Sequence, residues 1–119
     1  MIHEGHQESW ERLEEILTAN NAEQLKTYLD TLPPGETARA LSRLREEDRR
    51  HILILLPPVD AALLLEEISA VQAAEMIEEL PTRQAAAIID QLPSDEQTDL
   101  LSALDEDHAA TILQEMLPE

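Results

Sequence analysis

The chain has 119 residues, a formal net charge of −18 and no cysteine. Its length suits one domain, and the lack of cysteine excludes disulfides, zinc–thiolate sites and a thiol nucleophile. A surface this negative repels phosphate groups, so neither nucleic-acid binding nor direct contact with an anionic membrane is expected.

The negative charge is concentrated in the C-terminal half. Residues 1–50 contain eleven acidic and seven basic side chains, whereas residues 51–119 contain fifteen acids and one base, Arg83. Such a surface attracts cations or a basic partner, although solubility alone also explains it. No apolar run approaches the roughly 20 residues that cross a bilayer. We therefore expect the chain itself to be soluble and intracellular.

The chain begins with two atypical segments. Residues 1–7 are polar and are expected to be disordered. They contain His3 and His6, but Gly5 disfavours a helix and the spacing is not that of the HExxH zinc signature. Residues 8–20 resemble a degenerate repeat unit, which we expect to cap the exposed end of a stack.

A twelve-residue repeat covers the rest of the chain. The closing aliphatic positions are Leu32, Leu44, Leu56, Ile68, Leu80, Leu92, Leu104 and Met116. Three residues before them lie Leu29, Leu41, Leu53, Leu65, Ile77, Ile89, Leu101 and Leu113, and four before them lie Tyr28, Ala40, Ile52, Leu64, Met76, Ile88, Leu100 and Ile112. A fixed period of this kind indicates a stack of like units.

Each unit has the pattern of one short helix. Apolar residues fall seven, four, three and zero positions before the end of the unit, which is one stripe of a 3.6-residue helix. Proline follows Leu32, Leu56, Leu80 and Leu92 and separates consecutive helices. Ser69 and Ser94 each begin a capping-box pattern that ends in Gln, and Asp105 is a further candidate cap.

Helices of eight to ten residues are marginal alone and must stack to be stable. The sequence therefore predicts an all-α fold, a right-handed superhelix or solenoid of about nine short helices, with residues 1–119 as one domain. Trp10 and Tyr28 are expected to pack in the terminal core.

The recurring phrase Leu-Pro-x-x-acid/Gln-Ala-Ala-x-x-Ile/Leu-x-x-Leu between Leu56 and Met116 resembles the amino-terminal superhelical domain of MgtE-type magnesium transporters. The resemblance covers about residues 8–117. Helices of the flagellar motor-switch protein FliG are similar in build. The alternative is therefore a FliG-like or free-standing protein-interaction solenoid with no metal role.

The resemblance implies a function and partners. In the MgtE family this domain precedes a pair of CBS domains and a membrane pore, and the full-length protein is a homodimer. The resemblance implies a cytosolic regulatory domain whose acidic face binds Mg²⁺ at the interface with the CBS domains, which closes the pore. The chain ends at Glu119 without CBS or membrane segments, so we expect an excised domain, with a free-standing homologue as the alternative. The sequence contains no Gly-rich phosphate loop and no arranged nucleophile, so we expect no enzyme.

The resemblance points to Asp95, Glu96 and Asp99, in the helix that follows Pro93, as Mg²⁺ ligands. Mg²⁺ prefers hard oxygen ligands and often uses only one or two protein carboxylates. Favourable interaction with the helix dipole is the alternative role of Asp95 and Glu96, because both lie in a first turn. Asp99 lies beyond that turn and has no basic residue three or four positions away.

A second acidic set lies in the last turns of the expected helices, where the helix dipole disfavours negative charge. Its members are Glu66, Glu67, Glu78, Glu79, Asp90 and Glu115. A cation held by these carboxylates and by free carbonyl groups would explain their position. A solvated acidic edge would explain it as well.

The main basic cluster contains Arg45, Arg49 and Arg50, which flank the acidic residues 46–48. Local ion pairing is the simple interpretation, and docking onto an acidic neighbouring domain is the functional one. His51 and His108 lie in distant repeats with no nucleophile arranged around them, so neither indicates catalysis.

Overall fold

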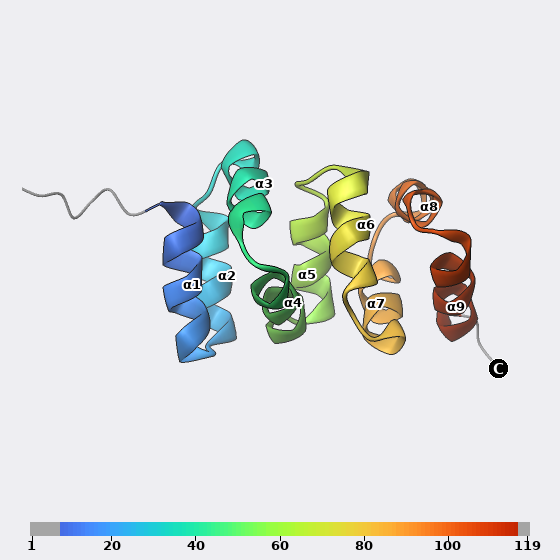
Figure 1. The fold of residues 1–119 in the computed structure, drawn as a ribbon, viewed down its shortest axis with the longest axis horizontal. Coiled ribbons are helices and arrows are strands. Elements are labelled where there is room, and N and C mark those ends of the chain that lie inside the picture. Colours follow the sequence, from blue (N-terminus) through green and yellow to red (C-terminus); the bar gives the residue numbers. More distant parts are fainter. Residues whose placement is uncertain (1–7, 117–119) are drawn as a thin grey trace, which may run out of the picture.

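The computed structural model describes residues 8–116, and every regular element in that part of the chain is an α-helix (Figure 1). The helices lie in a row about 59 Å long and 23 × 22 Å in cross-section. They are α1 (Ser9–Ala19), α2 (Ala22–Asp30), α3 (Pro34–Arg43), α4 (Glu46–Leu55), α5 (Pro58–Leu65), α6 (Ala70–Glu78), α7 (Thr82–Ile89), α8 (Ser94–Ala103) and α9 (Glu106–Met116).

These nine helices between residues 8 and 116 confirm the predicted all-α class. The handedness of the superhelix and the extent of the domain over residues 1–119 stay predictions. The expected disorder of residues 1–7, including His3 and His6, concerns residues outside those that the structure describes.

Proline ends one helix and begins the next, as the sequence indicated. Pro33, Pro57, Pro81 and Pro93 are the N-cap residues of α3, α5, α7 and α8, with extended backbone and ψ between 145° and 155°. Proline disfavours helical geometry in the residue before it, which stops the preceding helix. Its carbonyl oxygen accepts the first hydrogen bond of the new helix, as Pro93 does from the Gln97 N–H at 2.9 Å.

Two of the three predicted side-chain caps are confirmed. The Ser69 hydroxyl oxygen accepts a hydrogen bond from the Gln72 N–H at 3.1 Å, and an Asp105 carboxylate oxygen accepts one from the His108 N–H at 2.8 Å. Each satisfies a backbone donor that has no partner within its helix.

The predicted cap at Ser94 is wrong. Ser94 is the first residue of α8, because the neighbouring Pro93 takes the N-cap position. The Gln97 side chain donates to the Leu92 carbonyl at 3.0 Å and so satisfies an acceptor of the preceding turn. The proline signal therefore outweighs the Ser-x-x-Gln pattern here.

The repeat buries its apolar stripe between helices that are two units apart. The main contacts join α1 with α3, α5 with α7, α6 with α8, and α7 with α9. The alanine pairs Ala61–Ala62, Ala73–Ala74 and Ala85–Ala86 are buried and allow close approach of the helices. Leu113 is the exception, with 43% of its surface exposed, because no helix follows α9 among the described residues.

The first helix, α1, packs at the N-terminal end of the stack as the sequence indicated. In α1, Leu13, Ile16 and Leu17 are buried, and the helix ends at Asn20, whose left-handed backbone (φ 56°, ψ 39°) asparagine tolerates well. Trp10 and Tyr28 are partly buried against the core, as expected for terminal packing.

The packing predicts a contrast between two isoleucines of α4. Ile52 is fully buried and Ile54 is 45% exposed. Ile52→Ala should lower the free energy of unfolding by about 2–5 kcal/mol, because it removes a buried side chain and leaves a cavity. Ile54→Ala should cost less than about 1 kcal/mol. Urea denaturation measures both, and equal losses would contradict the arrangement of the stripe.

Candidate cation-binding site

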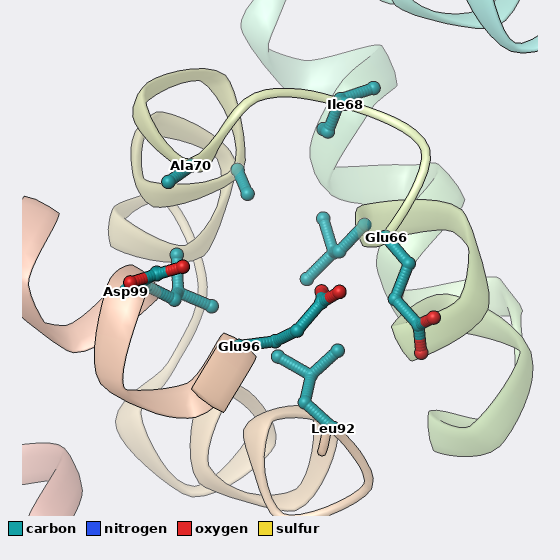
Figure 2. Close-up of a pocket in the computed structure, with 9 residues that line it drawn as sticks. Glu66, Ile68, Ala70, Leu92, Glu96 and Asp99 are labelled. Carbon is teal, nitrogen blue, oxygen red and sulfur yellow. The ribbon is translucent and has the colours of Figure 1, made fainter. Parts of the chain in front are cut away.

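A cavity of about 190 Å³ lies where the end of α5, the start of α6 and the N-terminal half of α8 meet. Three acidic residues line it together with apolar side chains: Glu66, Glu96 and Asp99 (Figure 2). Glu66 lies across the cavity from Glu96, while Ile68 and Leu92 contribute apolar wall. This is the place where the described residues bring sequence-predicted acids from both sets together.

Local structure explains how these acids reach the cavity. Pro93 begins α8, so Glu96 falls in its first turn and Asp99 lies three residues later on the same face. Glu66 is the C-cap residue of α5. The helix ends meet because units two apart stack: Ile68 and Leu92 are 24 residues apart, twice the repeat, and both line the cavity.

The surroundings of Glu96 raise its proton affinity. Partial burial raises the pKa of Glu96 above its ordinary value, and the negative charges of Glu66, Asp95 and Asp99 raise it further. Asp95 is exposed and does not line the cavity, so it acts on Glu96 through its charge alone. Among the described residues, no ion pair involves any of these four carboxylates.

The six last-turn acids do not form one site, and Asp90 and Glu115 border a groove together with Arg83. Glu66 lines the cavity, whereas Glu67 borders a separate groove that also includes Lys26 and Asp30. Glu78 and Glu79, at the end of α6, point into two further environments. In the sequence pattern these residues are equivalent. The pattern does not show that Glu66 lies in the same cavity as Glu96 and Asp99. Glu66 lies 30 residues before Glu96 and 33 before Asp99, and neither separation is a multiple of the twelve-residue repeat, so the period gave no signal that pairs the two sets.

Glu79 forms an ion pair within the chain. The Arg49 guanidinium lies 3.1 Å from a Glu79 carboxylate oxygen, and the two side chains are 21% and 13% exposed. Arg49 also donates to the Leu44 carbonyl. Burial raises the pKa of Glu79, and the Arg49 hydrogen bond and charge oppose that rise. This pair links α4 to the end of α6 across 30 residues.

The other two arginines of the predicted docking cluster make local ion pairs. Arg45 lies 3.5 Å from Glu47 and 3.6 Å from Asp48, and Arg50 lies 3.9 Å from Glu46. These contacts agree with the simple interpretation of the cluster. Docking of a partner onto these arginines stays a prediction.

Helix length bears on how the chain relates to a membrane. Within residues 8–116, none of the helices has both the length and the apolar character needed to cross a bilayer.

The sequence pattern of the family described as the MgtE intracellular N domain matches residues 32–119. The chain belongs to this family, which confirms the resemblance seen in the Leu-Pro repeat. The family is a transporter-associated domain and not an enzyme family, so non-enzymatic function is supported at that level.

The chain is also similar to a solved structure, the crystal structure of the soluble part of a magnesium transporter. The sequences are 23% identical, and the TM-score is 0.46. The match covers 94% of this chain and 49% of the other, so the chain spans about half the length of that structure. No curated protein matches the chain.

The crowded acids predict a raised pKa for Glu96. A carbon-detected NMR titration of its carboxyl group should give a value above that of an ordinary glutamate, and Asp95→Asn should lower it by removing a nearby charge. Asp90→Asn is the control and should leave the pKa of Glu96 unchanged.

The raised pKa of Glu96 also affects stability. Since this pKa is higher in the folded state than in the unfolded state, the folded state binds the proton more tightly. The contribution of Glu96 to stability therefore falls as the pH rises through its folded pKa. An ordinary pKa for Glu96 would contradict this account.

The Arg49–Glu79 pair predicts an asymmetric mutational response. Arg49→Met should lower the free energy of unfolding at pH 7 by about 1–3 kcal/mol, because it leaves a largely buried carboxylate without its partner. The loss should shrink at acid pH, where Glu79 takes up a proton. Arg50→Met, the control in an exposed pair, should cost less than about 1 kcal/mol. Equal losses for the two variants in thermal and urea unfolding would refute the role of the pair.

Proposed function

We propose that this chain is the magnesium-sensing regulatory domain of an MgtE-like transporter or channel, and that it binds Mg²⁺ at the cavity lined by Glu66, Glu96 and Asp99. The proposal rests on one observation: the three carboxylates that line the cavity lie close together and have no basic partner among the described residues. Such a group is destabilised by mutual repulsion, and a divalent cation relieves it.

The donor chemistry fits Mg²⁺. The polar side chains that line the cavity are carboxylates, and Mg²⁺ prefers oxygen ligands while it keeps several waters. Both Glu66 and Asp99 are exposed, so the cavity is open to solvent on one side. An ion held there has room for water or for ligands from a second domain.

The open side of the cavity suggests how binding becomes regulation. A domain that supplies further oxygen ligands, such as a CBS domain of the same transporter, completes the coordination when Mg²⁺ is abundant. The shared ion then holds the two domains together and favours a closed pore. When Mg²⁺ is scarce, the shared ion is lost, the two domains separate, and the pore is released.

NMR titration of the chain with Mg²⁺ tests the metal role. We expect saturable shifts confined to the surroundings of Glu66, Glu96 and Asp99. Asp99→Asn should weaken the affinity about tenfold, which corresponds to roughly 1.4 kcal/mol of lost interaction. Asp90→Asn changes the exposed C-cap residue of α7, which lies outside this cavity, and should leave the affinity unchanged.

Sodium at matched ionic strength is the second control. Shifts that are uniform over the surface and equal for Na⁺ and Mg²⁺ would indicate simple screening. That result would reject the sensor proposal and favour the protein-interaction solenoid without a metal role.

A further inference from the structure

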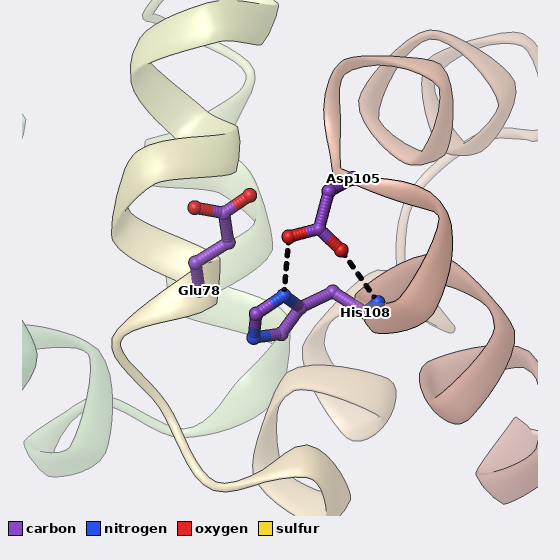
Figure 3. A group of neighbouring side chains, drawn as sticks. All are labelled: Glu78, Asp105 and His108. Carbon is purple, nitrogen blue, oxygen red and sulfur yellow. Dashed lines mark hydrogen bonds and ion pairs between the residues drawn. The ribbon is translucent and has the colours of Figure 1, made fainter.

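A second group of side chains suited to bind a metal lies outside the cavity that is lined by Glu66, Glu96 and Asp99. Glu78 ends α6, Asp105 is the residue before α9, and His108 lies in the first turn of α9 (Figure 3). One ligand atom from each residue lies within 4.8 Å of the others. The repeat thus brings two carboxylates and an imidazole together from positions 27 and 30 residues apart.

The start of α9 holds two of these side chains in place. One Asp105 carboxylate oxygen accepts the His108 backbone N–H at 2.8 Å, and the other lies 2.9 Å from the His108 ring nitrogen Nδ1. The first contact is the helix cap, so it fixes the carboxylate, which in turn orients the imidazole. A bound ion takes the place of the Asp105–Nδ1 hydrogen bond, so this contact matters because it places two ligand atoms only 2.9 Å apart before any ion binds.

Glu78 completes the group from a separate helix. Its carboxylate is exposed, and no hydrogen bond or ion pair to it is found among the described residues. It lies in the last turn of α6, where the helix dipole favours a cation and disfavours the acid itself. Two carboxylates and a neutral imidazole carry a charge of −2, which balances one divalent ion.

We propose that Glu78, Asp105 and His108 bind a divalent transition-metal ion of the Zn²⁺ type. The imidazole decides the class of ion, because nitrogen suits Zn²⁺ and its transition-metal neighbours, whereas Mg²⁺ selects oxygen. The ion replaces the proton on Nδ1, and the imidazole binds as the tautomer with hydrogen on Nε2. Three protein ligands leave a fourth position of a tetrahedral site to water.

A metal here would link two helices that make few direct contacts. The main neighbours of α6 and α9 are α8 and α7 respectively. An ion shared by Glu78 and the α9 pair therefore ties together the C-terminal part of the stack. This site is separate from the magnesium cavity, because the two share no residue. Either proposal can fail without the other.

Isothermal titration calorimetry with ZnCl₂ at pH 7.5 tests the site. The full chain should carry His3→Ala and His6→Ala, which removes two other imidazoles that compete for zinc in such a titration. We expect one Zn²⁺ per chain, with binding retained in excess Mg²⁺ and a Zn²⁺-dependent rise in the melting temperature.

Single substitutions assign the ligands. His108→Ala keeps the backbone cap, and Glu78→Gln keeps the shape of the side chain, so both should fold. Each should weaken Zn²⁺ binding about tenfold or more. His51→Ala is the matched control, since His51 contacts Asn20 far from the group, and it should have no effect.

NMR of the imidazole nitrogens supplies an independent measurement. Zn²⁺ should shift the Nδ1 resonance of His108 and leave the ring of His51 unchanged. Equal affinity in the His108→Ala or Glu78→Gln variant, no saturable binding below millimolar Zn²⁺, or displacement by equimolar Mg²⁺ would overturn the proposal.

Discussion

The burial of one aliphatic stripe between helices two repeats apart is the constraint on which the rest of the structure depends. The helices are 8–11 residues long, too short to be stable alone. Most of them are stabilised by contact with the next-but-one helix, as in the pairs α5–α7, α6–α8 and α7–α9. Where no further helix is described, after α9, Leu113 is left partly exposed. The same stacking sets which helix ends meet, and therefore where the charged side chains gather.

The uneven charge of the chain has a structural consequence. Basic residues are concentrated in the N-terminal half, where acids pair with them, as Asp48 does with Arg45. Arg49 from the same half also pairs with Glu79 of the C-terminal half. The C-terminal half has only Arg83 as a base, so its acids gather without neutralisation. The raised pKa of Glu96 reflects that crowding. A cation is the simplest remaining means of balancing it, which links the amino-acid composition to the proposed sensor role.

Local signals predicted the helices well and the sites only in part. Proline after the closing leucine marked the boundaries, and it also overrode the weaker Ser94 pattern, since a proline carbonyl can begin a helix one residue earlier. Asp95, Glu96 and Asp99 were named because the family resemblance pointed to the helix that follows Pro93. Glu66, which lies 30 residues before Glu96, was not placed with them. Nor was His108 placed beside Glu78, because proximity between helices is absent from a one-dimensional pattern.

The sequence by itself determined the helical class, the period and the division into an apolar face and an acidic surface, because each depends on the spacing of residue types within one unit. The tertiary structure decided which acids share a cavity, which arginine is buried against a glutamate, and which histidine faces carboxylates. Those outcomes depend on the offset between stacked helices. That offset is set by side-chain packing over the whole row, and no single repeat contains it.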